Sequence, residues 1–346
     1  MNRAEQAIAA RGAVAIYYEH PDWFRPLFDE LDRRGTPYVR LHANEHRYDP
    51  SETASPFVVV FNRMSPSAYV RGGGATIFYT TQFLAHLRLF GVRVINGYDA
   101  WRVEVSKAYQ LSLLERLGLP YPKARIISDA AAAPAAAEGL RYPVVVKPNI
   151  GGSGAGIRRF DTPAELERAA RGGELDLGID HTALVQEFIP AESGRIVRVE
   201  VLDGRFLYAI RVYTTGDTFN LCPADVCQRV DGLELERLAC PADAARNGLR
   251  VEGYTPPAEV TTAVERITAA SGIEVGGVEY VVDERDGRLY YYDVNALSNF
   301  VADAANVVGF DPFACLADWL GDELARAREG RAAPELAGVG IAARDA

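Results

Sequence analysis

A glycine-rich stretch at residues 147–157 reads KPNIGGSGAGI and follows an apolar run. Lys147 ends that run, and four glycines follow within residues 151–156. Glycine lets backbone N–H groups close around phosphate oxygens, and a lysine adds a positive charge at the same place. The pattern therefore indicates a phosphate-binding loop. A surface hairpin is the alternative interpretation.

Three familiar loop types do not match this stretch. No Gly-Lys-Ser/Thr follows the glycines, so it is not a Walker loop. It is not a dinucleotide fingerprint, because it leads into a strand at 157–160 before a helix begins near 163–171 with a capping box at Thr162. Residues 151–155 also fall one residue short of the nucleophile elbow of a serine hydrolase.

Length and charge exclude some classes of protein. The chain has 346 residues, enough for two or three compact lobes, and no apolar run approaches the roughly eighteen residues of a membrane span. A net charge of −10 disfavours nucleic acid as a partner, because phosphate backbones bind clustered Lys and Arg. Residues 1–12 do not read as a secretory signal, so we expect a cytoplasmic protein with no membrane partner.

The cysteines are few and unevenly spaced, at Cys222, Cys227, Cys240 and Cys315. This spacing fits a reduced compartment better than a disulfide framework. A zinc site built from the first three stays open as an alternative to incidental thiols, although no nearby His supports it.

Strand-like and helix-like segments alternate over residues 1–100. The strand-like segments are 13–18, 36–41, 57–61 and 92–95, and the helix-like segments are 23–34 and 81–90. This alternation predicts a small parallel α/β domain over residues 1–100.

Two further lobes are expected after this domain. Residues 101–190 begin with a helix capped by Ser106 and contain a buried strand at 142–148 before the glycine-rich stretch. Residues 191–330 contain two predicted hairpins. The Ala- and Gly-rich residues 331–346 are expected to form a mobile tail.

The second hairpin turns at residues 283–287 and brings acids together. Glu279 and Asp293 are equidistant from Asp286, so a regular antiparallel register places them opposite each other. Asn295 shares a face with Asp293 because side chains alternate along a strand. Such oxygen ligands suit Mg²⁺, which takes its remaining ligands from waters and phosphates. A solvated hairpin with scattered acids is the alternative.

The first hairpin turns at Asp203-Gly204 and carries arginines instead. A regular register places Arg198 opposite Ala209 and diagonal to Arg211, on one face. Two arginines there would form a site for a planar anion such as phosphate or carboxylate. Exposed surface arginines are the alternative interpretation.

In order and spacing these elements resemble the ATP-grasp superfamily, and within it the RimK-type and glutathione-synthetase-like carboxylate–amine ligases. The likeness covers most of the chain. It implies an α/β fold of α+β lobes, in which an N-terminal parallel α/β domain precedes two lobes that clasp ATP. The positions that the resemblance assigns to the ATP phosphates are Lys107, Lys147, Gly152, Ser153 and Gly154.

The resemblance also assigns the rest of the site. Adenine would bind the hinge strand through Gln186, Glu187, Phe188 and Ile189, and ribose would contact Glu192. The groups that would hold the acyl phosphate are Arg198, Arg211 and Asn220, and the catalytic residues would be Arg198, Arg211 and Lys147. The metal positions are Glu279, Asp293 and Asn295, for two Mg²⁺ ions, with Mn²⁺ as an alternative.

The chain departs from the family pattern at three places. Ile196 stands where many RimK-type ligases have an acid, and Asp293 replaces the usual metal-bridging glutamate. Residues 296–300 lack the Pro-Gly that often follows the last metal ligand. The acceptor pocket is therefore expected to be distinctive.

The function implied by the resemblance is transfer of the γ-phosphoryl group of ATP to a carboxylate, followed by attack of an amine on the acyl phosphate. The substrates would be small-molecule or peptide acids and amines. An ATP-grasp phosphotransferase and a non-catalytic nucleotide-binding module stay open as alternatives, and so does a homo-oligomer.

Overall fold

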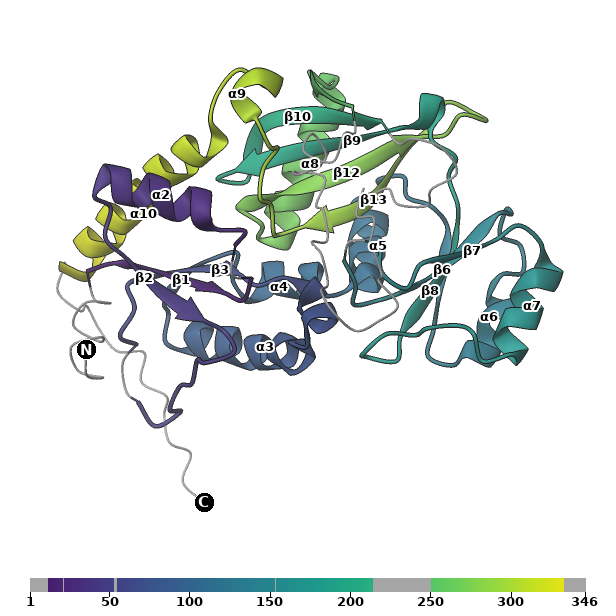
Figure 1. Ribbon diagram of the computed structural model, residues 1–346, viewed down its shortest axis with the longest axis horizontal. Helices are drawn as coiled ribbons and strands as arrows, with labels where there is room; N and C mark the ends of the chain where they lie inside the picture. The colour runs from purple at the N-terminus through teal and green to yellow at the C-terminus, as the bar shows by residue number, and fades with distance from the viewer. Residues whose placement is uncertain (1–11, 21, 53–54, 153, 214–249, 333–346) are drawn as a thin grey trace.

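The computed structural model describes residues 12–20, 22–52, 55–152, 154–213 and 250–332, which form three lobes (Figure 1). The N-terminal lobe is built on one sheet, the central lobe projects to one side, and the third lobe lies above the junction of the other two in the view of Figure 1. No helix in these ranges is long and apolar enough to cross a membrane.

The N-terminal lobe is a parallel α/β layer structure, as the alternation of segments predicts. Its sheet has the order β2-β1-β3-β4, and every pair is parallel. The strands are β1 (Val14–Tyr18), β2 (Tyr38–His42), β3 (Val59–Arg63) and β4 (Arg93–Ile95). The helical segments are α2 (Arg25–Arg34), η1 (Pro66–Arg71), α3 (Gly74–Leu89) and α4 (Tyr98–Glu104).

The helix predicted from residue 81 begins earlier in the structure, because α3 starts at Gly74. Three consecutive glycines at residues 72–74 read as a turn in the sequence, since glycine disfavours helix interiors. Gly72 has φ 82 and ends η1, so it does form a turn, and the helix starts two residues later.

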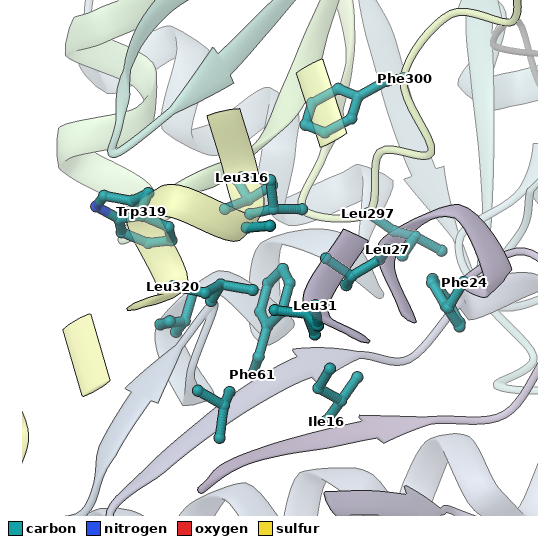
Figure 2. Close-up of a cluster of buried hydrophobic side chains, with 14 of the residues drawn as sticks. Ile16, Phe24, Leu27, Leu31, Phe61, Leu297, Phe300, Leu316, Trp319 and Leu320 are labelled. Atoms are coloured by element: carbon teal, nitrogen blue, oxygen red, sulfur yellow. The ribbon is translucent and has the colours of Figure 1, made fainter. Parts of the chain in front are cut away.

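The C-terminal helix α10 (Pro312–Ala332) packs against α2 of the N-terminal lobe (Figure 1). Figure 2 shows the apolar core that results, in which Leu316 and Leu320 of α10 meet Leu27 and Leu31 of α2. This core also includes Phe300, so it joins the first lobe to the end of the third.

The central lobe carries the glycine-rich stretch on an antiparallel sheet of order β5-β8-β6-β7. Its strands are β5 (Ala124–Ile127), β6 (Val144–Pro148), β7 (Arg158–Phe160) and β8 (Ala183–Glu187). The helical segments are α5 (Lys107–Arg116), η2 (Ala130–Ala132), α6 (Ala133–Ala136) and α7 (Pro163–Arg171). The predicted cap at Ser106 and capping box at Thr162 are both confirmed.

The third lobe is an antiparallel sheet of order β11-β10-β9-β12-β13, covered on one face by α8. Its strands are β9 (Arg195–Leu202), β10 (Arg205–Tyr213), β11 (Val251–Tyr254), β12 (Val275–Val282) and β13 (Leu289–Asn295). Its helical segments are η3 (Glu192–Gly194), α8 (Ala258–Ser271) and α9 (Ala304–Val307). Both predicted hairpins are present.

Asn96 joins the N-terminal lobe to this sheet. It is fully buried, and its Nδ2 donates hydrogen bonds of 2.6 Å to the carbonyls of Val275 and Ala296. Its Oδ1 accepts from the backbone N–H groups of Glu274 and Val275. The first strand position of β12 and the residue after β13 are therefore fixed to the end of β4.

Candidate active site

One cavity lies where the three lobes meet, and each lobe contributes to its lining. The central lobe provides the glycine-rich stretch and the hinge strand, the third lobe provides β9, β12 and β13, and the first lobe provides the turn around Ser65. The predicted site residues that line it are Lys107, Lys147, Gly152, Gly154, Gln186, Glu187, Phe188, Ile189, Arg198, Glu279, Asp293 and Asn295.

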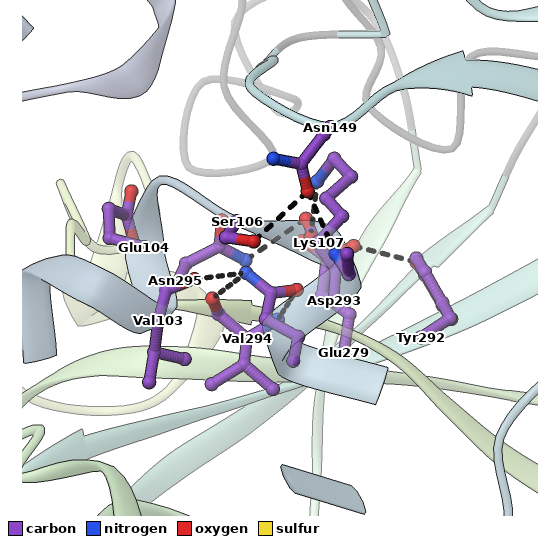
Figure 3. Close-up of polar contacts among 12 residues, drawn as sticks. Val103, Glu104, Ser106, Lys107, Asn149, Glu279, Tyr292, Asp293, Val294 and Asn295 are labelled. Atoms are coloured by element: carbon purple, nitrogen blue, oxygen red, sulfur yellow. Dashed lines mark hydrogen bonds and ion pairs between the residues drawn. The ribbon is translucent and has the colours of Figure 1, made fainter. Parts of the chain in front are cut away.

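The two predicted acids lie opposite each other, as the hairpin register indicated. Glu279 pairs with Asp293, and Asn295 follows two residues later on the same face (Figure 3). A bulge beside Glu279 leaves Tyr292 outside the pairing, and its hydroxyl donates a 2.6 Å hydrogen bond to Oε2 of Glu279. Asn295 Nδ2 donates to Asp293 Oδ2 at 3.2 Å, so the amide oxygen is the atom that can face a cation.

Lys107 contacts this acid pair from the first turn of α5. Its Nζ lies 2.7 Å from Asp293 Oδ1 (Figure 3). Burial disfavours the charged form of Lys107, but the negative charge of Asp293 outweighs burial, so the pKa of Lys107 lies above its usual value. Burial would raise the pKa of Asp293, but the charge and hydrogen bond of Lys107 hold that pKa below its usual value.

Lys147, at the end of β6, has a different electrostatic environment. Its side chain is buried, and burial together with the positive charge of Lys107 lowers the pKa of Lys147 to about 7. A negative group such as a phosphate would favour its charged form. The two lysines therefore enter the cavity with opposite pKa shifts.

Asn149 ties the glycine-rich stretch to α5, a role that the sequence analysis missed. Its Oδ1 accepts hydrogen bonds from Ser106 Oγ (3.1 Å) and from the N–H of Ala108 (2.9 Å) (Figure 3). Its Nδ2 donates to Asp180. The only sequence signal is its place two residues after Lys147, where a polar side chain follows a buried strand.

Arg198 is buried between two acids and is not the surface arginine of the alternative interpretation. It is 3% exposed, and its Nη1 donates to Glu279 Oε1 at 2.9 Å while its Nε donates to Glu200 Oε1 at 2.6 Å. The β9–β12 register pairs Arg198 with Glu279 directly. A guanidinium therefore reaches the same carboxylate pair as the lysines.

The predicted partnership of Arg198 with Arg211 is wrong. A bulge between Phe206 and Tyr208 shifts the β9–β10 register by one residue, so Arg198 pairs with Ile210 and not with Ala209. Because side chains alternate, the shift turns Arg211 to the opposite face of the sheet.

That face is the one that α8 covers, so Arg211 does not line the cavity. Its guanidinium sits 3.8 Å from the ring centroid of Tyr254 and 3.5 Å from Glu252. Nothing in the sequence around residues 206–208 signals the bulge. Arg211 as a catalytic or substrate-binding residue is therefore not supported by its position.

The hinge strand β8 and the residues after it line the cavity as expected for a base-binding strand. Glu187 accepts from the N–H of Arg141, and the N–H of Phe188 donates to the Pro143 carbonyl, so this segment is held by the loop before β6. Glu192 does not line the cavity and forms an ion pair of 2.6 Å with Arg195. Its ribose contact stays a prediction.

Two predicted positions, Ser153 and Asn220, lie outside the described residues. So do three of the cysteines, Cys222, Cys227 and Cys240, and with them the alternative zinc site.

Glycine is required in the glycine-rich stretch because neighbouring atoms pack closely against it. Gly154 and Gly156 both have φ 73, and a Cβ on Gly156 would lie 2.8 Å from Pro148 Cγ. A Cβ on Gly152 would lie 3.0 Å from Cβ of Ser67 in the N-terminal lobe. The stretch thus lies directly against both β6 and the first lobe.

Glu104 is a further buried acid that the sequence analysis missed. It lines the cavity and accepts a hydrogen bond from the N–H of Ala296, directly after Asn295. Burial raises its pKa to about 7. Nothing in its sequence context, three residues before Lys107, distinguishes it from a surface glutamate of α4.

The donor set of Glu279, Asp293 and Asn295 fits magnesium that also binds phosphate. Mg²⁺ takes oxygen ligands, keeps several waters, and commonly uses only one or two carboxylates beside substrate phosphates. In the part of the chain that the structure describes, no group of three or more His, Cys, Asp or Glu could hold a metal by itself. Two acids and one amide would therefore hold Mg²⁺ only together with phosphate and water oxygens, and not as a complete cage.

Part of this chain is similar in sequence to known proteins. Residues 105–225 match the family model of the RimK-like ATP-grasp domain. A D-alanine–D-alanine ligase of Geobacter sulfurreducens is 29% identical over 182 residues, which cover 49% of this chain and 54% of the relative. The chain thus spans about half the length of this curated relative.

Solved structures share the fold over nearly the whole chain. A RimK domain ATP-grasp protein from Sphaerobacter thermophilus is 22% identical, with a TM-score of 0.60 over 89% of this chain and 98% of that one. The D-cycloserine synthetase DcsG is 18% identical, with a TM-score of 0.63 over 90% of this chain and 100% of that one.

Proposed function

This chain has the ATP-grasp fold and matches the RimK-like ATP-grasp domain over residues 105–225, as the sequence predicted, and we propose its function on that basis. We infer that it is an ATP-dependent ligase that activates a carboxylate as an acyl phosphate, couples it to an amine, and releases ADP and phosphate. The observation that carries this proposal is the opposed pair Glu279 and Asp293, which faces Lys107, Lys147 and Arg198 in one cavity.

In this proposal the nucleotide lies between the central and third lobes. The backbone of β8 and residues 188–189 contacts the base, and the glycine-rich stretch covers the phosphates. Lys147 and Lys107 balance phosphate charge, and Lys107 exchanges its contact with Asp293 for one with phosphate. Glu279, Asp293 and Asn295 would hold Mg²⁺, and the bound ion would supply positive charge beside the phosphates.

The first reaction forms an O–P bond between a substrate carboxylate oxygen and the γ-phosphorus, and ADP leaves with the electron pair of the broken bond. The second reaction forms a C–N bond between the acyl carbon and an amine; the acyl C–O bond breaks, inorganic phosphate leaves with its electron pair, and the amine nitrogen gives up one proton, which the released phosphate accepts. Arg198 is buried next to Glu279, where its fixed guanidinium stabilises the negative charge on the acyl oxygen. The cavity must also exclude water, because an acyl phosphate hydrolyses readily.

The substrates that we propose are a small or peptide carboxylic acid and an amine. Support comes from the relatives, which include a D-alanine–D-alanine ligase and a D-cycloserine synthetase. The two Mg²⁺ ions follow from the same family resemblance and are part of the proposal.

A hydroxylamine trap tests the proposal. The protein is incubated with Mg-ATP, hydroxylamine and pools of amino acids and small carboxylic acids, and hydroxamates and ADP are measured by mass spectrometry. The expected result is a hydroxamate formed together with ADP, which also identifies the acid. ADP with a phosphorylated product and no hydroxamate would instead establish a phosphotransferase.

A matched pair of variants connects that result to the cavity. Asp293→Asn removes one of the proposed metal ligands and is expected to abolish hydroxamate formation. Asp286→Asn makes the same change in the turn of the same hairpin, where an amide oxygen can still accept from the N–H of Arg288 and only a 3.7 Å ion pair with the exposed Arg141 is lost. Equal activity of the two variants would contradict the assigned site.

A further inference from the structure

One wall of the cavity is lined by four polar residues that the nucleotide and metal roles do not use. They are Trp23, Ser65, Ser67 and Asn299, which we call the donor wall. Three belong to the N-terminal lobe, and Asn299 lies in the 296–300 segment where the chain departs from its family. The hydrogen-bond donors of these four residues determine which ligand group can bind there.

The two serines leave one hydroxyl hydrogen for the cavity. Their Oγ atoms are 2.7 Å apart, so one hydroxyl donates to the other. Ser65 Oγ also accepts from the N–H of Ser67, and Ser67 Oγ accepts from Arg71 Nη1 at 3.2 Å. Two hydroxyls carry two hydrogens, and no described residue accepts the second one. Whichever serine donates, the pair presents a donor.

Asn299 also presents donors to the cavity, because Arg63 fixes its orientation. Arg63 Nη2 donates to Asn299 Oδ1 at 3.3 Å and to the Ser298 carbonyl. A guanidinium has only donors, so the amide oxygen must face Arg63 and the NH₂ group must face away. No described residue accepts a hydrogen bond from that NH₂ group, although Asn299 lines the cavity.

Trp23 adds a third donor on a rigid ring. Its indole stacks on His20 with a centroid separation of 4.1 Å and an interplanar angle of 7°, and the Arg71 guanidinium lies 5.1 Å from the ring. The Nε1–H group has no acceptor among the residues that the structure describes. Trp23 lines the cavity and its ring is held by these neighbours, so we count its N–H group among the donors available to a ligand there.

A carboxylate is the group that matches such a wall. An ionised carboxylate only accepts hydrogen bonds, whereas a carboxamide would also bring its own NH₂ against these donors. Arg63 donates a hydrogen bond to Asn299, and Arg71 donates one to Ser67, so each of these donors is polarised by a guanidinium. Glu19 partly offsets this charge, since it forms hydrogen bonds of 2.9 and 2.7 Å to Arg71.

We propose that the donor wall binds a free carboxylate of a substrate, distinct from the carboxylate that is phosphorylated. This inference rests on the proposed ligase function and names its substrate class: either the acid or the amine carries a second, unreacted carboxylate. Such substrates are amino acids, dicarboxylic acids and peptides with a free C-terminus.

Asn299→Asp is the main test, because it is isosteric and keeps an oxygen toward Arg63. It replaces the NH₂ donor by an acceptor with a negative charge, which repels a carboxylate. We expect KM for the carboxylate-bearing substrate to rise by about tenfold or more, since hydrogen bonds to charged groups contribute about 1.5–3 kcal/mol. KM for ATP should stay unchanged, and an increase confined to ATP would overturn the proposal.

Two further variants control for folding and for charge. Trp23→Phe keeps the aromatic ring next to His20 but removes the N–H, and is expected to raise the same KM several-fold. Asn44→Asp makes the same chemical change as Asn299→Asp at an exposed residue whose Oδ1 accepts from Thr76, and it should change no KM.

The amine used in the assay identifies which substrate carries the carboxylate. Hydroxylamine has none, so if Asn299→Asp raises KM for the acid in the hydroxamate assay, the acid carries it. If hydroxamate formation is normal but ligation to an amino acid is impaired, the amine carries it. An Asn299→Asp enzyme with normal KM values for both substrates would refute the donor wall.

A binding measurement separates this inference from the proposed function. Thermal unfolding is followed with Mg-ADP and each common amino acid, small dicarboxylic acid or dipeptide with a free C-terminus, or the carboxamide of each, without turnover. The wild type should be stabilised by at least one of these compounds more than by its carboxamide, and Asn299→Asp should lose that difference. If none of these amino acids, dicarboxylic acids and dipeptides stabilises the wild type more than its carboxamide does, the donor wall is wrong, whether or not the hydroxamate assay succeeds.

Discussion

At the scale of single residues, the cavity separates two lysines that a sequence cannot distinguish. Lys107 is paired with Asp293, whereas Lys147 is buried beside a like charge. Their opposite pKa shifts come from three-dimensional neighbours that lie far away in the chain. The ligand-free cavity therefore holds Lys147 near its point of half-protonation at neutral pH.

This difference predicts proton uptake when Mg-ATP binds. With a pKa of about 7, Lys147 is mostly neutral at pH 8, and the phosphates should restore its charged form. Because the pKa of Lys147 is lowered in the folded protein, its uncharged form is favoured in the free protein above pH 7. Binding of Mg-ATP should therefore take up close to one proton per site near pH 8 and about half a proton at pH 7. Calorimetry in buffers of different ionisation enthalpy measures this number.

Lys147→Arg is the matched variant for that experiment, because an arginine is always charged. Proton uptake attributable to this position should disappear, while titration of ATP itself remains in both proteins. Equal uptake by wild type and variant would show that Lys147 is already protonated in the free enzyme.

The role of a residue could be predicted where the alternation of side chains along a strand indicates it. It could not be predicted where the role depends on a contact with a residue distant in the chain. The sequence indicated Glu279, Asp293 and Asn295 because alternation along a hairpin brings them together. Asn149 and Asn299 could not be found, because each acts through a partner distant in the chain.

At the scale of elements, two bulges decide which side chains reach the cavity. The bulge beside Glu279 leaves its pairing with Asp293 as predicted, whereas the bulge between Phe206 and Tyr208 turns Arg211 out of the site. A bulge inserts one residue into one strand and has no reliable sequence signature in either hairpin. The two hairpins were therefore predictable from the sequence, but the register of β9 with β10 was not.

The position of the Arg198 guanidinium in the cavity depends on Gly277. A Cβ there would lie 2.8 Å from Nε and Nη2 of Arg198, so the guanidinium occupies the space of a side chain. Gly277→Ala should displace Arg198 from Glu279, lower kcat by about tenfold or more, and reduce the free energy of unfolding by about 1–3 kcal/mol. Enzyme kinetics and chemical denaturation measure both effects.

Gly321→Ala is the control for this prediction. It makes the same substitution inside α10, where the nearest atom to a new Cβ is Thr36 Oγ1 at 3.9 Å. The free energy of unfolding should rise by about 0.5–1 kcal/mol, because alanine favours helix, and kcat should not change. Normal kinetics in Gly277→Ala would mean that catalysis does not require a glycine beside the Arg198 guanidinium.

At the scale of the whole molecule, the first and third lobes form a continuous body that the order of segments did not reveal. The helix α10 returns to pack on α2, and Arg93 of β4 contacts both Glu323 of α10 and Glu274 before β12. These contacts join residues that are about 180 to 230 positions apart. Hydrophobic periodicity predicts which face of a helix or strand is buried, but it does not predict which distant element packs against that face.

Asn96 is the polar centre of this junction. Its φ of 51 lies in the left-handed region that Asn tolerates better than most residues, and its side chain makes four hydrogen bonds with the backbone of the third lobe. Asn96→Ala should leave these buried groups unsatisfied and reduce the free energy of unfolding by about 2–5 kcal/mol. Chemical denaturation measures the loss.

The same variant should weaken nucleotide binding, because Ala296, one of the groups that Asn96 holds, directly follows Asn295. A higher Kd for Mg-ATP at a temperature where the variant remains folded would show that the lobe junction positions the metal ligands. Asn306→Ala removes an exposed asparagine that contacts Asp303, and should change stability by less than about 0.5 kcal/mol. If Asn96→Ala is destabilised but binds Mg-ATP with the wild-type Kd, the junction supports the fold alone and the site is held by its own strands.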